Sequence, residues 1–310
     1  MAEKLLNYEV MRKLGEGAAS VIYAVCDPAT GRMFALKHVE RKKPKDLRFI
    51  EQMESEFAIS KQFNHPNLRK SYDLKIHKSM LLKVTEAFLI MELVDGRPLD
   101  TRPPSTVLET IITFMHAASG LRAMHQLGYV HCDIKPNNIL IDGGNNVRVI
   151  DYGQSCAIGT IKERIQGTPD YIAPEQVNRQ PVTVQTDVYN LGATLYWALT
   201  GTHAPTLYTV NRHGENSFLL DATLQTPAEL NPLVSPALSK LVMDCISTRG
   251  DKRPADMDAV LTRLELSRHA MQKRPTEGPD PQDSGVNDVI IEPVPDVAPP
   301  AEPLPPEPRV

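Results

Sequence analysis

The chain has 310 residues, a formal net charge of −4 and 41% hydrophobic residues, so it can bury one large core or two smaller ones. No dense basic patch is present, which argues against nucleic-acid binding. No apolar run reaches the roughly 18 residues of a membrane span, and the N-terminus lacks an apolar signal core, so we expect a cytoplasmic protein without a membrane span. Four widely spaced cysteines form no zinc or disulfide pattern and indicate a reducing compartment.

The first hundred residues have the pattern of short strands around one helix. From Asp46 onward, apolar residues recur every three or four positions, which predicts an amphipathic helix. Two further strands are expected before Val94. The sequence Asp95–Pro98 breaks the pattern and is expected to be a hinge. The apolar runs that predict the first three strands are Tyr8–Leu14, Val21–Cys26 and Met33–Val39.

Helices are expected to dominate after this hinge. Thr106 and Glu109 have the spacing of a capping box at a helix start, and Gly128 suits the left-handed position that ends a helix. The segment Asn190–Thr200 is apolar nearly all round, which predicts a buried helix. Two further amphipathic helices are expected at Leu238–Cys245 and Ala255–Leu266.

Residues 275–310 differ in composition from the rest of the chain. They contain eleven of the 26 prolines, eight acidic residues and one basic residue, so their formal charge is −7 and that of residues 1–274 is +3. Such a segment buries too little apolar surface to offset its ordering entropy, and we expect it to be disordered. It is either a solubilising spacer or a docking segment for a proline-binding module, and the sequence leaves both open.

Two features of the first half are compatible with nucleotide binding. Gly15 and Gly17, with Glu16 between them, separate two expected strands, so backbone amides could approach phosphate oxygens there, although a plain tight hairpin has the same composition. On the third strand, Ala35 and Lys37 lie on one face. Ala35 leaves room for a flat base, which Ile22 would cover from above.

The segment His131–Asn138 contains the chemistry of a phosphoryl-transfer site. Asp133 can accept a hydroxyl proton, Lys135 can hold a phosphate, and Asn138 can bind a metal ion. Thirteen residues after Asn138, Asp151 begins the sequence Asp-Tyr-Gly. A base, a cation and two oxygen ligands at these spacings form a chemically coherent set.

These motifs resemble those of the eukaryotic-like (Hanks-type) serine/threonine protein kinase family over about residues 8–270. The resemblance implies an α+β bilobal fold. Residues 8–94 would form a small, antiparallel β-rich N-lobe with one long helix, and residues 95–270 a larger, mainly helical C-lobe, followed by the tail at 275–310. It also implies Mg²⁺-dependent transfer of the ATP γ-phosphoryl group to Ser or Thr hydroxyls of protein substrates.

The resemblance also implies residue roles. Asp133 would be the catalytic base, Lys135 would steady the γ-phosphate, and Asn138 and Asp151 would hold Mg²⁺. Of three glutamates that could pair with Lys37, Glu56 is preferred because it lies eight residues before a segment, 64–67, that resembles a family landmark. The ATP-binding residues implied are Gly15, Glu16, Gly17, Ile22, Ala35, Lys37 and Glu56.

The segment 167–175 resembles the substrate loop of the family, where Thr168 and Lys135 together indicate Ser/Thr acceptors. Cys132 replaces an arginine that commonly receives a loop phosphate in this family, so activity is expected not to need that phosphorylation. Cys132 itself is either an inert thiol or a redox sensor. Ser60 stands where the family usually packs an apolar side chain. Glu175 and Arg253 are expected to form a buried ion pair.

Two other functions are compatible with parts of the pattern. A catalytically inactive scaffold of the same fold could act through the proline-rich tail, but intact Lys37, Asp133, Asn138 and Asp151 argue against it. A small-molecule kinase of related fold is disfavoured by the substrate loop at 167–175.

Overall fold

The computed structural model describes residues 3–272 apart from 18, 81 and 214–223. Residues 1–273 form one compact unit, and the fold given below is that of its described part. The expected tail at 275–310 lies outside the described residues, and its role as a spacer or docking segment stays a prediction.

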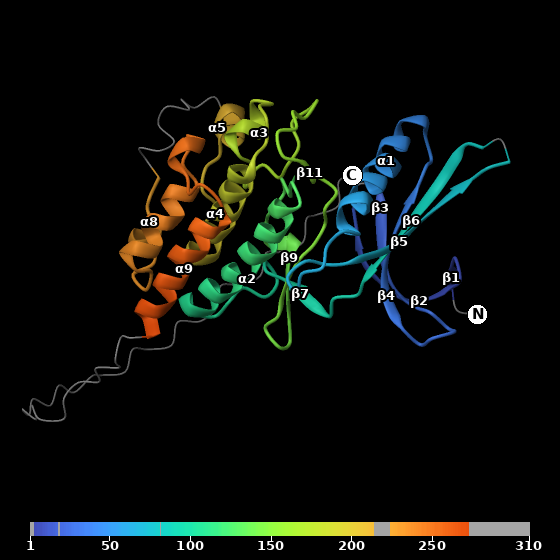
Figure 1. The fold of residues 1–310 in the computed structure, drawn as a ribbon, viewed down its shortest axis with the longest axis horizontal. Coiled ribbons are helices and arrows are strands. Elements are labelled where there is room, and N and C mark those ends of the chain that lie inside the picture. Colours follow the sequence, from blue (N-terminus) through green and yellow to red (C-terminus); the bar gives the residue numbers. More distant parts are fainter. Residues whose placement is uncertain (1–2, 18, 81, 214–223, 273–310) are drawn as a thin grey trace, which may run out of the picture. The chain divides into compact units, whose positions relative to one another are not determined.

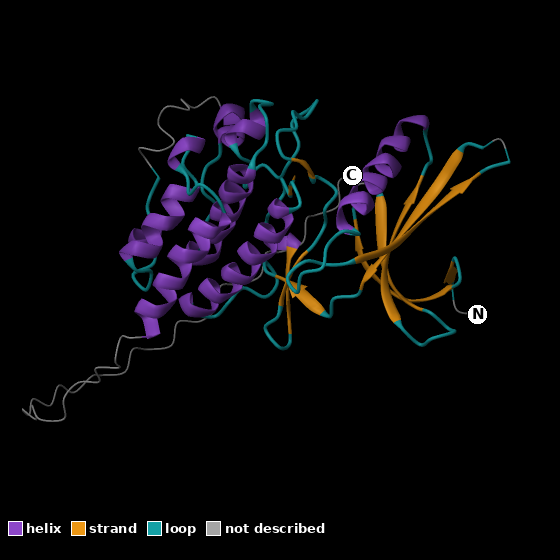
Figure 2. Ribbon diagram, viewed as in Figure 1, coloured by secondary structure: helices purple, strands orange, loops and turns teal. Residues whose placement is uncertain are grey.

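The N-lobe is a six-stranded antiparallel sheet with strand order β1-β2-β3-β4-β6-β5. Helix α1 (Leu47–Ser60) lies against this sheet (Figures 1 and 2), after the 3-10 turn η1 (Pro44–Asp46). Its buried residues Ile50 and Met53 pack in one apolar cluster with Ala35 of the sheet. The strands are β1 (Lys4–Leu5), β2 (Tyr8–Glu16), β3 (Ser20–Cys26), β4 (Met33–Glu40), β5 (Ser71–Lys78) and β6 (Val84–Glu92).

The C-lobe is mainly helical, with two small sheets of order β10-β9-β7 and β11-β8. The helices are α2 (Val107–Gln126), α3 (Pro174–Val177), α4 (Val184–Thr200), α5 (Leu207–His213), α7 (Pro227–Leu230), α8 (Pro236–Cys245) and α9 (Met257–Gln272). The strands and 3-10 turns are β7 (Gly96–Pro98), β8 (Tyr129–Val130), η2 (Pro136–Asn138), β9 (Ile139–Asp142), β10 (Val147–Val149), β11 (Cys156–Ala157) and η4 (Gly250–Lys252). The expected bilobal α+β fold is confirmed.

The hinge segment contains an element that local sequence did not indicate. Within Asp95–Pro98, β7 pairs antiparallel with β9, so that Gly96 lies opposite Asp142 and Arg97 opposite Ile141. The partner strand follows more than forty residues later, and the periodicity of a three-residue strand carries no signal for it.

The start and end of α2 show how local sequence defines a helix. Thr106 accepts a hydrogen bond from the Glu109 backbone N–H at 3.1 Å, as expected of a cap. The Glu109 carboxylate accepts from the Ser105 N–H at 2.8 Å, one residue earlier than in a standard capping box. Gly128 has φ +85°, a conformation that favours glycine.

Helix α4 contributes several residues to the C-lobe core, and twelve of its 17 residues are buried. It approaches α8 closely at Gly192, where an added Cβ would lie 2.4 Å from the Cβ of Cys245. A larger residue at Gly192 would therefore separate the two helices.

Glu175 and Arg253 form a two-pronged ion pair inside the C-lobe. The guanidinium Nη1 and Nη2 donate to the two carboxylate oxygens at 2.8 and 3.0 Å. The Arg253 side chain is fully buried, and it also donates to the carbonyls of Gln185 and Ser247. Thr186 donates its hydroxyl to Glu175 at 2.8 Å. Removing one partner would leave the other charge buried without compensation.

We expect Arg253→Met to lower the free energy of unfolding by about 3–5 kcal/mol, because the Glu175 carboxylate then loses its buried counter-charge. Chemical denaturation followed by fluorescence measures the loss. The matched control is Arg249→Met, which removes the exposed ion pair with Asp251 and should change stability far less. Equal losses in the two variants would show that the buried pair does not stabilise the C-lobe.

Candidate active site

The backbone of the 131–138 segment is held by a buried carboxylate of α4. Asp187 accepts hydrogen bonds from the backbone N–H groups of His131 and Cys132, both at 2.8 Å, and lies 2.8 Å from Nε2 of His125. Burial raises the pKa of the Asp187 carboxyl, but the bonds from His125 and His131 lower it below the ordinary value overall. The charged form of Asp187 thus positions the loop that carries Asp133.

Three polar residues, Thr168, Lys135 and Asn138, contact Asp133. Its Oδ1 accepts from the Thr168 hydroxyl at 2.8 Å, and its Oδ2 lies 3.0 Å from Nζ of Lys135. Lys135 also donates to the Thr168 hydroxyl at 2.9 Å. The Asn138 amide nitrogen donates to the Asp133 carbonyl at 2.8 Å. The loop at 131–138 and the loop at 167–175, separate in sequence, therefore form one cluster.

The Lys37 ammonium group on β4 lies between two carboxylates. Its Nζ donates to Glu56 Oε2 at 2.7 Å and to Asp151 Oδ1 at 3.4 Å. Of the three candidate glutamates, Glu56 is 1% exposed and contacts Lys37, whereas Glu51 and Glu54 are exposed. The structure thus joins β4 and α1 of the N-lobe to the Asp-Tyr-Gly segment of the C-lobe.

The same contacts determine the charge states of this ion pair. Burial lowers the pKa of the Lys37 ammonium, but the carboxylates of Glu56 and Asp151 raise it above its ordinary value overall. The Lys37 charge in turn holds the pKa of the Asp151 carboxyl well below its usual range. Both groups are charged at neutral pH.

Sequence reasoning missed a second cation beside Glu56. Arg69, 5% exposed, places its guanidinium Nη2 3.7 Å from Glu56 Oε1. Among the described residues, Glu56 Oε1 and Arg69 Nε are buried without a hydrogen-bond partner. An arginine just before β5 has no local feature that marks it as buried, because its partner belongs to α1.

The region of Ser60 contains a hydrogen bond between two hydroxyl groups. Ser60 donates to Ser71 Oγ at 2.7 Å, and both side chains are buried. The ring of Tyr152 packs edge-on against Phe63, with ring centroids 4.7 Å apart, and its hydroxyl donates to the Val149 carbonyl at 2.7 Å. Phe63, which sequence reasoning did not single out, thus supplies the apolar contact to the aromatic ring.

A cleft with a volume of about 310 Å³ contains part of the expected site. The expected residues that line it are Gly17, Lys37, Glu56, Asp133, Lys135 and Asp151. Residues that line it without having been expected to are Ala19, Ser20, Val39, Phe49, Gln52, Met53 and Gln154. The cleft thus has cationic and anionic groups on its floor and apolar groups from β4 and α1.

The remaining expected site residues lie outside the lining of this cleft. Ile22 and Ala35 pack in the apolar cluster beneath α1. Glu16 is exposed and paired with Lys13, and Gly15 precedes it on β2. Asn138 and Thr168 adjoin the cleft through their bonds to Asp133, described above. The structure therefore places Lys37, Glu56, Asp133, Lys135 and Asp151 around one cleft, whereas Ile22 and Ala35, expected to contact the nucleotide base, do not line it.

Asn138 and Asp151 carry the oxygen donors that a hard divalent cation such as Mg²⁺ prefers. Both hydrogen bonds of the Asn138 amide use its nitrogen, so its Oδ1 remains available as a ligand, and Asp151 is ionised. Across the described residues, no group of three or more His, Cys, Asp or Glu side chains could hold a metal by itself. Mg²⁺ is commonly bound by one or two protein oxygens, with phosphate and water oxygens as its other ligands, so Asn138 and Asp151 would be sufficient.

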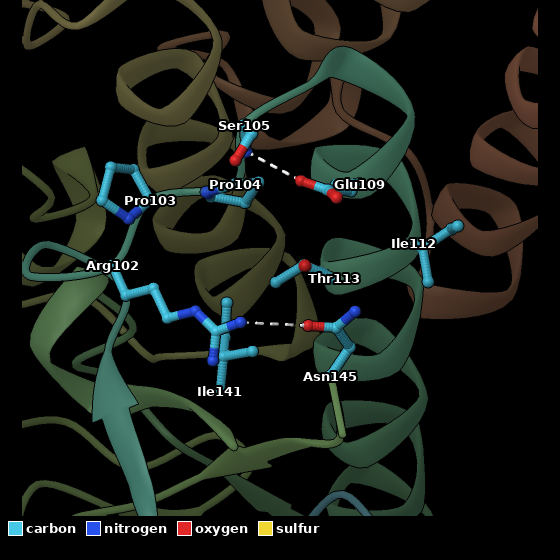
Figure 3. Close-up of a pocket in the computed structure, with 9 residues that line it drawn as sticks. All are labelled: Arg102, Pro103, Pro104, Ser105, Glu109, Ile112, Thr113, Ile141 and Asn145. Carbon is cyan, nitrogen blue, oxygen red and sulfur yellow. Dashed lines mark hydrogen bonds between the residues drawn. The ribbon is translucent and has the colours of Figure 1, made fainter. Parts of the chain in front are cut away.

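A separate pocket lies in the C-lobe, between the start of α2 and the turn joining β9 to β10 (Figure 3). Its polar groups already bind one another: Arg102 donates to the Asp142 carbonyl at 3.0 Å and to Asn145 Oδ1 at 3.5 Å. None of the expected site residues lines it. This pocket is separate from the cleft at Lys37 and Asp133.

Comparison with known proteins identifies the class to which this fold and site belong. The family model described as protein kinase domain matches residues 8–264, so the chain belongs to the protein kinase family. A probable serine/threonine-protein kinase of Corynebacterium efficiens is 28% identical over 291 residues, covering 86% of this chain and 42% of the relative. Serine/threonine-protein kinase PknA of Mycobacterium tuberculosis is 30% identical over 63% of this chain and 47% of its own length.

A third relative, serine/threonine-protein kinase PrkC of Bacillus subtilis, is 29% identical over 63% of this chain and 30% of its own length. The matched regions thus span less than half of each of these relatives. In the described part of this chain, no helix combines the length and the apolar character needed to cross a bilayer.

The ion pair of Lys37 predicts a chemical reactivity. We expect Glu56→Gln to accelerate acylation of the Lys37 amine at about pH 8.5. Loss of the Glu56 carboxylate lowers the pKa of Lys37, and each unit of that decrease raises the fraction of neutral, reactive amine about tenfold. Peptide mass spectrometry after timed exposure to an amine-reactive ester measures the rate. Glu54→Gln, an exposed position on the same helix, is the matched control and should leave the rate unchanged. An unchanged rate in Glu56→Gln would contradict the assigned pairing.

Proposed function

We propose that this chain transfers the γ-phosphoryl group of ATP to Ser or Thr hydroxyl groups of protein substrates. The observation that carries the proposal is the cluster of Asp133, Lys135 and Thr168 beside a cleft that also contains Lys37 and Asp151. Two lysines and two aspartates that could supply a base, phosphate-binding cations and a metal ligand thus line one cavity. Membership of the protein kinase family and the names of the relatives support the same conclusion.

Each polar residue would have a distinct task in the transfer. The Asp133 carboxylate would accept the proton of the acceptor hydroxyl as that oxygen attacks the γ-phosphorus. Lys135 would neutralise charge on the transferring group, and Lys37 would hold the α- and β-phosphates. Asn138 and Asp151 would hold Mg²⁺, which neutralises phosphate charge when bound. Because this transition state is loose, positioning and charge neutralisation supply most of the catalysis.

In this proposal the preference for Ser and Thr acceptors rests on the resemblance of Lys135 and Thr168 to the matching residues of serine/threonine kinases, and on the contact between them. The Thr168 hydroxyl accepts from Lys135 and donates to Asp133, so it fixes the distance between the base and the cation. Gln176 donates to the carbonyls of Cys132 and Gln166, at 2.8 and 3.1 Å, which supports the loop from the α3 side. The backbone of the base-bearing loop and that of the substrate loop are thereby held together.

We expect Asp133→Asn to lower the rate of phosphoryl transfer by about 10²–10⁴-fold, because an amide cannot accept the proton. Nucleotide affinity should be nearly unchanged, since Lys37, Asn138 and Asp151 remain. Radiolabelled transfer to a generic basic protein, phosphoamino-acid analysis and fluorescent-nucleotide titration are the measurements. Asp251→Asn, an exposed position, is the control. Transfer at the wild-type rate would refute the role of Asp133, and turnover only with small hydroxyl compounds would refute protein substrates.

We also expect full activity without phosphorylation of the 151–175 segment. The side chain at position 132 is a thiol rather than a guanidinium, and it lies against Cys156, so it offers no cation to a loop phosphate. Bonds to backbone carbonyls hold the segment instead, such as the one that Arg179 Nη1 donates to the Glu163 carbonyl at 3.3 Å. Phosphatase-treated protein, verified by intact mass, should retain its initial rate, and an inactive treated preparation would overturn this expectation.

A further inference from the structure

Two cysteines of the C-lobe, Cys132 and Cys156, are in contact at the 131–138 segment. Cys132 follows β8 and Cys156 opens β11, and these strands pair so that Cys156 lies opposite Val130. The two Sγ atoms are 4.0 Å apart. The contact joins a residue directly before Asp133 to a residue five positions after Asp151.

The two thiols have different surroundings. Cys132 is 1% exposed, and its pKa is raised by the contact with Cys156, by burial and by the Asp187 carboxylate. Cys156 is only partly buried, and its pKa is lowered by the hydrogen bond from Cys132, by the Lys162 ammonium and by the Thr160 hydroxyl. The accessible cysteine of the pair is therefore the one whose thiolate is favoured.

We propose that Cys132 and Cys156 form a dithiol site that a hydroperoxide converts reversibly into a disulfide. The Cys156 thiolate attacks the peroxide oxygen, the O–O bond breaks, and a sulfenic acid forms with release of water or alcohol after protonation. The Cys132 thiol then attacks the Cys156 sulfur, and the S–O bond breaks with release of water. One peroxide is reduced by two electrons and two thiols are oxidised to one disulfide.

Closing this bond requires a movement of about 2 Å, since a disulfide S–S distance is about 2.05 Å. The Cys132 backbone is held on both sides, by its N–H bond to Asp187 Oδ1 and by its carbonyl bond from Gln176, each 2.8 Å long. The movement therefore falls mainly on Cys156 and on the chain that follows it to Thr168. Because Thr168 contacts Asp133, the disulfide lowers phosphoryl transfer, an effect that rests on the proposed function.

The test exposes the full-length protein to stoichiometric hydrogen peroxide, blocks remaining thiols by alkylation and maps non-reduced peptides by mass spectrometry. We expect a peptide pair linked through Cys132 and Cys156 that dithiothreitol separates. In parallel, the rate of phosphoryl transfer should fall by about 10²-fold and recover after reduction. A loss of this size is typical when reacting groups are displaced by about 1 Å. Cys156→Ser should abolish the link and the peroxide sensitivity, whereas Cys26→Ser, a control in β3, should keep both.

The outcomes separate the two proposals. Accumulation of sulfinic acid at Cys156 without the linked peptide would overturn the dithiol site. The linked peptide with unchanged transfer would overturn its effect on activity. If untreated protein transfers no phosphoryl group, the proposed function fails, while the linked peptide still decides whether the dithiol site exists.

Discussion

The site depends on one constraint: the largely buried ammonium group of Lys37 needs compensating carboxylates, and these come from two other segments. A buried charge without a partner costs several kcal/mol, so β4, α1 and the Asp-Tyr-Gly segment are held together by the need to satisfy it. Glu56 and Asp151 supply the negative charges at 2.7 and 3.4 Å. The position of α1 against the sheet, and the floor of the cleft, follow from this arrangement of three charges.

A second buried carboxylate holds the 131–138 segment in place. Asp187 accepts from two consecutive backbone N–H groups, and the rigid helix α4 that carries it is buried along almost its whole length. Asp133 is therefore positioned by the backbone on which it stands, while Lys135 and Thr168 orient its two oxygens. Fixed donors and charges of this kind are what a loose phosphoryl-transfer transition state requires.

The two departures from the family pattern, at Ser60 and Cys132, each have a neighbouring side chain in contact with them. Ser60 is buried, but its hydroxyl bonds to Ser71, and Phe63 contacts the ring of Tyr152 instead. Cys132 lacks a cationic side chain, and its thiol meets Cys156. The buried Ser60 hydroxyl thus has a buried polar partner, as buried polar groups require.

Sequence alone determined which residue types stand at the motif spacings, the family resemblance, and the helices and strands with clear periodicity, because these depend on local pattern. Only the tertiary structure decided that β7 pairs with β9, that Arg69 lies beside Glu56, and that Cys132 meets Cys156. Each of these contacts joins two segments that are well separated in the sequence. The local sequence of one segment does not indicate which other segment it will contact. Packing and the compensation of buried charge select such pairs, and both are properties of the folded chain.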